Sequence, residues 1–138
     1  MTGRPRPTTL LMTGSAAILG LLGLAALFLP VEMARAAGWE AGSGLAIQVA
    51  AGGLLAVAAL NGMGRTAIYG GIYGRPIVLA NVALGTVAGL SLGRFAFSSP
   101  SAVWAWAGSV LFLAQAMAFG YLMRASPWRE TGGRGEGP

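Results

Sequence analysis

The sequence predicts an all-α integral membrane protein, a four-helix bundle with both termini in the cytoplasm. Of its 138 residues, 55% are hydrophobic and only 9% are charged, whereas an ordinary soluble domain is about 25% charged. Four continuous apolar segments each approach the roughly 20 residues that a helix needs to cross a bilayer core. Arginine is distributed unevenly between the two ends of these segments, and this asymmetry predicts the orientation.

The four spans are expected at about residues 8–29, 43–63, 76–97 and 101–123, within a transmembrane domain of residues 1–124. Pro30 closes the first span, and Pro76 opens the third, where the missing N–H of a proline costs nothing. The apolar runs do not alternate with polar residues, which favours helix over strand. Residues 125–138 are rich in Gly, Pro, Arg and Glu, and we expect them to form a flexible cytoplasmic tail.

Seven of the nine arginines fall on one side of this arrangement: Arg4, Arg6, Arg65, Arg75, Arg124, Arg129 and Arg134. Arg35 and Arg94 fall on the other side, together with Glu32 and Glu40. The positive-inside rule therefore places both termini in the cytoplasm, and the expected location is the bacterial inner membrane. The same bias accounts for the net charge of +5, so the charge gives no support to nucleic-acid binding.

Aromatic residues mark the same two boundaries, since amphipathic rings favour the headgroup region. The outer boundary holds Trp39, Phe95, Phe97, Trp104 and Trp106, and the inner one holds Tyr69, Tyr73, Tyr121 and Trp128. An alternative for the N-terminus is a cleaved signal peptide ending near Ala34-Arg35-Ala36. Its apolar stretch of about 20 residues exceeds the 7–15 residues usual for such peptides, which favours a membrane span.

Small residues line one face of several spans, as close helix packing in lipid requires. The third span has Gly85, Gly89 and Gly93 at four-residue spacing, which places them on one stripe. Similar sets are Gly20 and Gly23 with Ala16 on the first span, and Gly52 with Ala56 on the second. These faces serve either internal bundle packing, which we favour, or self-association.

Three amide side chains lie inside the spans, Gln48, Asn81 and Gln115. We expect each to face the bundle and to hydrogen-bond across helices, with a polar ligand pocket as the alternative. Arg94 lies about one turn from the outer end of the third span, at the depth of Glu32 and with the opposite charge. We therefore expect an ion pair between Glu32 and Arg94, with Glu40 as the substitute partner.

The connection from Asn61 to Pro76 is unlike the rest, because it holds five Gly, two Arg and two Tyr. Glycine amides beside Arg and Tyr can bind an anion such as a lipid phosphate. The candidate residues for binding an anionic lipid or small amphiphile are Asn61, Arg65, Tyr69, Tyr73, Arg75 and Asn81. A phosphate-binding P-loop is excluded, because the Gly-Lys-Ser/Thr ending and the preceding strand are absent. The alternative is a tight re-entrant or turn segment that carries positive-inside arginines and interfacial tyrosines.

This connection also resembles an uncharacterised family of small bacterial four-helix membrane proteins. The resemblance is carried by Asn61-x-Met63, by Gly70-Gly71-Ile72-Tyr73-Gly74-Arg75-Pro76 and by Asn81, and it covers roughly residues 38–97. It implies the four-helix membrane fold and an important loop, and it implies no activity. Many members have a His soon after the Asn, whereas Val82 to Leu84 offer none, which puts a His-dependent role in doubt.

The residue types that the chain lacks exclude most catalytic mechanisms and most metal sites. The chain has no Cys, His, Asp or Lys, which removes thiolate nucleophiles, His-based acid–base catalysis and nearly every common metal site. We therefore expect no enzyme, no metal and no cofactor. All four Glu map outside the spans, whereas proton-coupled transporters keep an ionisable residue inside the membrane. Small four-helix multidrug exporters need a Glu in the first helix, which here has only Thr8, Thr9, Thr13 and Ser15 as polar residues.

Three functional hypotheses remain. The first is a non-enzymatic accessory or scaffolding subunit of a membrane complex, or a small homo-oligomer, whose partners are other transmembrane helices and membrane lipids. The second is a protein that binds an anionic lipid or small amphiphile through the Asn61 to Asn81 segment. The third is a small dimeric transporter.

Overall fold

The computed structural model describes residues 7–65 and 74–125. Its elements are α1 (Pro7–Phe28), α2 (Pro30–Ala36), the 3-10 turn η1 (Ala41–Ser43), α3 (Gly44–Gly64), α4 (Gly74–Ser98) and α5 (Val103–Ala125). The four long helices α1, α3, α4 and α5 are apolar and long enough to cross a membrane. They coincide with the four predicted spans and confirm the all-α class.

The short helix α2 was not predicted, because residues 30–43 were expected only to connect two spans. Pro30 occupies its first turn, Glu32 lies in that turn and Arg35 lies in the last one, an arrangement that suits the helix dipole. The helix ends at Ala36 and is followed by Gly38, whose φ of +71° is left-handed backbone. The N–H of Trp39 then donates to the carbonyl of Ala34 at 2.8 Å, which closes the helix end in a Schellman motif.

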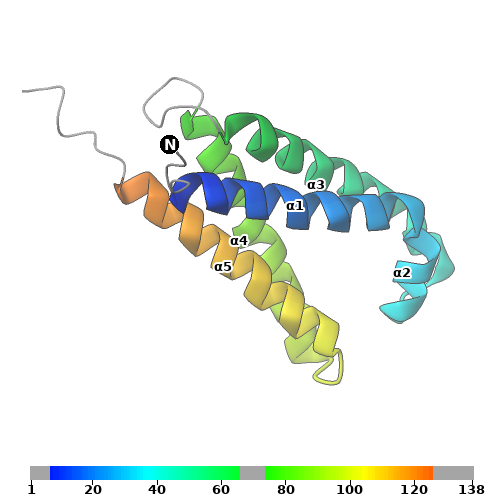
Figure 1. Cartoon of the computed structure of the whole chain (residues 1–138). Coiled ribbons are helices and arrows are strands. Elements are labelled where there is room, and N and C mark those ends of the chain that lie inside the picture. Colours follow the sequence, from blue (N-terminus) through cyan, green and yellow to red (C-terminus); the bar gives the residue numbers. More distant parts are fainter. Residues whose placement is uncertain (1–6, 66–73, 126–138) are drawn as a thin grey trace, which may run out of the picture.

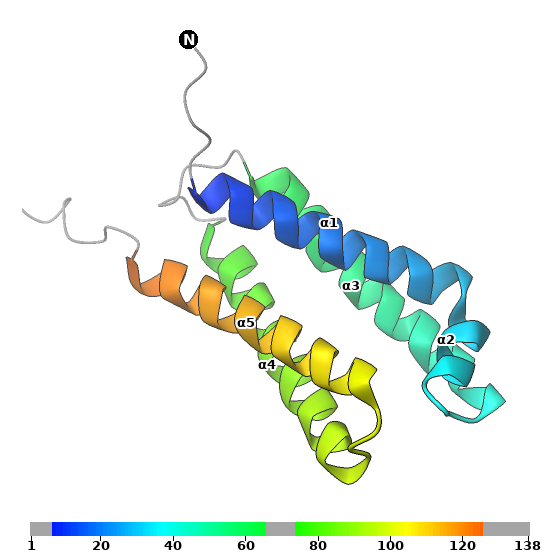
Figure 2. The ribbon, with the colours of Figure 1, turned by 60° about the horizontal axis from the view of Figure 1, so that its bottom comes forward.

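The long helices form two antiparallel hairpins, α1 with α3 and α4 with α5 (Figures 1 and 2). The hairpins meet at the end that holds the start of α1. They diverge toward the other end, which holds α2 and the α4–α5 turn. We call the first the closed end and the second the open end. In the predicted orientation the closed end is cytoplasmic.

Glycine allows very close packing within each hairpin. A Cβ at Gly85 of α4 would lie 2.6 Å from the carbonyl oxygen of Phe112 in α5, and one at Gly89 would lie 3.0 Å from the backbone nitrogen of Leu113. Gly93 follows on the same stripe, 3.0 Å from Oγ of Ser109 by the same measure. The stripe of Gly85, Gly89 and Gly93 is therefore covered by α5 and serves internal packing.

Of the other two predicted small-residue faces, the one on α1 is packed against a neighbour and the one on α3 is exposed. Gly23 of α1 packs on Leu55 of α3, where an added Cβ would lie 2.8 Å from the leucine Cγ. Gly52 and Ala56 of α3 are exposed, and an added Cβ at Gly52 meets nothing within 4 Å. Internal packing was therefore the wrong interpretation for Gly52 and Ala56, because α3 contacts α1 through the side that carries Leu55 and Ala58.

Three small clusters of buried apolar residues form the core. At the open end, Ala26, Ala34, Ile47 and Ala51 join α1, α2 and α3. In the middle, Leu19, Ala58 and Phe112 join α1, α3 and α5, and nearer the closed end Met12, Val78 and Phe119 join α1, α4 and α5. The contacts between the hairpins therefore lie mainly in the middle and at the closed end.

Aromatic rings join the two hairpins at the open end. Trp39, which follows α2, has its ring centroid 6.3 Å from that of Phe95 in α4 and 5.9 Å from that of Trp104 in α5. Phe97 and Trp106 form a separate edge-to-face pair with centroids 4.9 Å apart. The five aromatics predicted to mark the outer boundary thus gather at one end of the molecule.

Candidate functional site

Each of the four long helices contributes one polar side chain to a single buried cluster. Its members are Ser15 of α1, Asn61 of α3, Asn81 of α4 and Gln115 of α5. Asn61 and Asn81 are fully buried, with 0% of their surface exposed. Because polar groups are costly in lipid unless they are paired, this polar cluster is the natural candidate for a site.

The centre of the polar cluster is a reciprocal amide pair between α3 and α4. Nδ2 of Asn61 donates to Oδ1 of Asn81 at 2.8 Å, and Nδ2 of Asn81 donates back to Oδ1 of Asn61 at 2.6 Å. The second donor of each amide is also used. Asn61 Nδ2 donates to Oγ of Ser15 at 3.0 Å, and Asn81 Nδ2 donates to the carbonyl of Ile77 at 2.8 Å.

Oδ1 of Asn81 is the acceptor on which the other helices converge. It receives Nε2 of Gln115 at 2.9 Å and the hydroxyl of Ser15 at 3.5 Å. In the parts of the chain that the structure describes, no buried side-chain nitrogen or oxygen lacks a hydrogen-bond partner. The side chains of the polar cluster include no titratable group and no thiol. Their hydrogen bonds join the four long helices to one another.

Sequence reasoning found two of the four members. Asn81 and Gln115 face the bundle and bond across helices as predicted. The sequence places Asn61 in the last turn of the second span and makes it a candidate for anion binding, not for bonding across helices, and it predicts no partner for Ser15. One signal was available, because Asn61 and Asn81 are the only asparagines in the chain and flank one connection between antiparallel spans.

Gln48 does not face the bundle, contrary to the prediction. It lies at the start of α3 and is exposed, and its Nε2 donates to the carbonyl of Leu27 at 3.5 Å. The last carbonyls of a helix have no partner within it. Gln48 therefore donates a hydrogen bond to one of the last carbonyls of α1, at the open end of the molecule.

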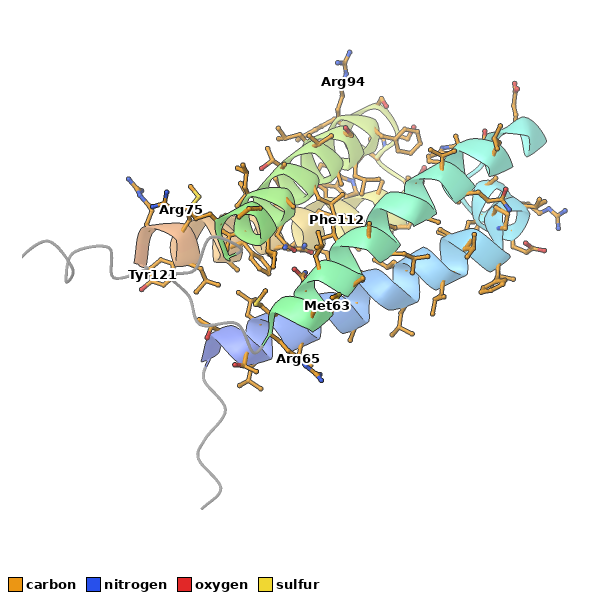
Figure 3. The ribbon with its side chains drawn as sticks, turned by 90° about the horizontal axis from the view of Figure 1, so that it is seen from above. Met63, Arg65, Arg75, Arg94, Phe112 and Tyr121 are labelled. Carbon is orange, nitrogen blue, oxygen red and sulfur yellow. The ribbon has the colours of Figure 1, made fainter. Side chains whose placement is uncertain are left out.

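The residues proposed for anion binding do not come together as one site. Asn61 and Asn81 are buried in the polar cluster, whereas Arg65 and Arg75 are exposed. Figure 3 shows the two arginines at the same end of the molecule but on opposite sides of it. Tyr69 and Tyr73 lie outside the described residues.

Glu32 and Arg94 are likewise not joined. Both are exposed, Glu32 on α2 and Arg94 on α4. Within residues 7–65 and 74–125, no ion pair links Arg94 to Glu32 or to Glu40. Figure 3 shows the Arg94 side chain pointing away from the rest of the molecule.

These features define a class of protein. Four long apolar helices, whose interior polar groups bind one another, make a multi-pass integral membrane protein with a helical bundle. Comparison with protein-family models, curated proteins and solved structures gives no match. The resemblance based on the loop motif stays a prediction, and residues 66–73 of that motif lie outside the described residues.

Proposed function

We propose that the protein is a non-enzymatic packing subunit of the membrane, either an accessory or scaffolding component of a larger complex or a small homo-oligomer. The observation that carries this proposal is the outward face of α3. This face, here called the α3 face, consists of Gly52, Gly53, Ala56 and Ala59, all of which are exposed.

The α3 face offers close approach to another helix. An added Cβ at Gly52 or Gly53 meets nothing within 4 Å, whereas the glycines between α4 and α5 are tightly covered. Helices in lipid associate through backbone contact at small residues, because lipid is as apolar as leucine and gives no hydrophobic drive. A partner helix on the α3 face would gain contacts of the kind that Gly85 and Gly89 make internally.

The polar cluster supports a packing role over a chemical one. Its amides are used by one another, so they bind helices together and offer no paired donor and acceptor to a substrate. The chain also lacks Cys, His, Asp and Lys. Arg65 and Arg75 lie apart (Figure 3), which gives the anion-binding hypothesis less support than the packing role.

The test is the assembly state of the full chain after extraction from its native membrane in a mild detergent. We expect the parent chain to elute as a homo-oligomer or with a co-purifying partner. The double substitution Gly52→Leu with Ala56→Leu fills the α3 face and should release a monomer. The control is Ala83→Leu with Ala107→Leu, which adds similar bulk, one carbon less in total, to exposed positions of α4 and α5.

Light scattering and chemical crosslinking in the membrane measure the outcome. Circular dichroism establishes that both double variants keep their helix content. A parent chain that is strictly monomeric and free of partners would contradict the proposal. An assembly that survives on filling the α3 face, or that the control disrupts equally, would also contradict it.

A further inference from the structure

Arg94 occupies an unusual place, because it projects from the outward face of a membrane span. Leu90 and Phe97, its neighbours on that face of α4, are 60% and 75% exposed. Figure 3 shows the Arg94 side chain directed away from every other helix. This face would meet lipid, so Arg94 places a permanent positive charge among side chains that suit acyl chains.

The distance of Arg94 from the end of α4 determines whether its guanidinium can reach the membrane interface. It lies four residues before Ser98, the last residue of α4, which is about 6 Å along the helix axis at 1.5 Å per residue. An arginine at this depth can extend its side chain to the interface while its methylene groups stay in the apolar layer. A charge left in the hydrocarbon would cost several kcal/mol, by order of magnitude.

Nothing in its own hairpin neutralises this charge. The segment from Gly74 to Ala125 contains no Asp or Glu. Glu32 and Glu40 belong to the other hairpin and form no ion pair with Arg94 in the described parts of the chain. No carboxylate of residues 7–65 and 74–125 therefore supplies a counter-charge to Arg94, and an anionic group of the surrounding membrane can do so.

The aromatic residues of the open end indicate which anionic group Arg94 can reach. Phe97, one turn from Arg94, forms an edge-to-face pair with Trp106, and Trp39, Phe95 and Trp104 gather at the same end. Tryptophan collects at the level of lipid headgroups, where the phosphates lie. Arg94 thus reaches toward the layer in which the anionic group is a phosphate.

We propose that Arg94 binds the phosphate of a phospholipid in the leaflet at the open end of the molecule. The guanidinium is a planar fork that donates two parallel hydrogen bonds to phosphate oxygens. The exposed apolar side chains of Leu90 and Val87 lie below it on α4 and would contact the acyl chains of the same lipid. The site is independent of the α3 face and does not rest on the packing role.

The experiment is native mass spectrometry of the full chain in detergent, titrated with dioleoyl-phosphatidylglycerol or with dioleoylglycerol, which lacks the phosphate. We expect the parent chain to retain the phosphatidylglycerol and not the dioleoylglycerol. Arg94→Gln should weaken phosphatidylglycerol binding about tenfold, the scale of one lost charge-assisted contact. Arg94→Lys should keep part of the binding, because the charge remains without the fork.

The control is Arg35→Gln, which removes an exposed arginine of α2 at the same end and should leave lipid binding unchanged. Circular dichroism verifies that the variants fold. Equal phosphatidylglycerol binding by the parent chain and Arg94→Gln would overturn the proposal. So would a dimer that Arg94→Glu abolishes and Arg94→Glu with Glu32→Arg restores, since Arg94 would then pair with a carboxylate of a second copy.

Discussion

Asn81 is the residue on which the polar contacts of the molecule converge. Its amide bonds to side chains from α1, α3 and α5 and to a carbonyl of its own helix. It is fully buried. Removing it would leave Asn61 and Gln115 with donors and an acceptor that lipid cannot satisfy.

We expect Asn81→Leu to lower the free energy of unfolding by about 2 kcal/mol, because a buried polar group that loses its partner costs about 1–3 kcal/mol. Gln48→Leu is the matched control, since it removes an amide that is exposed and makes one long hydrogen bond. We expect it to cost less than about 0.5 kcal/mol. Unfolding in mixed detergent micelles measures both. If both variants lowered the free energy of unfolding equally, the polar cluster would not stabilise the fold in the way we expect.

At this scale the sequence predicted Asn81 and Gln115, because an amide in the middle of an apolar helix has to find a partner. It did not predict Ser15, since a lone hydroxyl can bond to its own helix and needs no partner elsewhere. The role of Asn61 was not predicted, because the glycines and arginines that follow it favoured an anion-binding segment, whereas the Asn61 side chain is buried in the last turns of α3 and bonds to Asn81. Gly64 at the end of α3 packs closely on α4 and α1, where an added Cβ would lie 2.7 Å from Cδ1 of Ile77 and 3.1 Å from Cε of Met12.

Helix α4 shows how one glycine sets the distance between two elements. A Cβ at Gly85 would meet the backbone of α5 at Phe112 and Ala116. Backbone atoms cannot move aside as the end of a flexible side chain can. The separation of α4 and α5 therefore depends on the absence of a side chain at residue 85.

Gly85→Ala should destabilise the protein by about 1–3 kcal/mol, the usual range for overpacking a core. Gly14→Ala on the exposed face of α1 is the comparison, because its added Cβ meets nothing within 4 Å. It should be neutral or slightly stabilising, since alanine favours helix over glycine by up to about 1 kcal/mol. The same unfolding assay reads both variants. A tolerated Gly85→Ala would mean that the two helices are not in backbone contact.

The positions of the long helices could be read from the sequence, because the length of an apolar run is a strong signal in a membrane protein. The seven residues of α2 could not, because a helix so short depends on its caps and on contact with α3. Nor could the side that α3 turns inward, since small and apolar residues surround it almost evenly. The prediction for Gly52 failed for this reason, whereas Gly85 of α4 packs on α5 as predicted.

The whole molecule is two tight hairpins that are joined by the polar cluster and the apolar residues beside it, and by Trp39 at the open end. The hairpin arrangement had no sequence signal, because antiparallel neighbours pack equally well in a symmetric four-helix bundle. The orientation, with both termini in the cytoplasm, stays a prediction that depends on the arginine distribution.

The most direct test of this account is the distance between the hairpins, measured by double electron–electron resonance. The chain has no cysteine, so spin labels can be attached at introduced Cys pairs. Met63 and Tyr121 are 80% and 72% exposed and report across the hairpins (Figure 3), whereas Val87 and Val110 report within one hairpin. We predict that Asn81→Leu broadens the first distribution and leaves the second narrow. A first distribution that stays unchanged would contradict the claim that the polar cluster joins the hairpins.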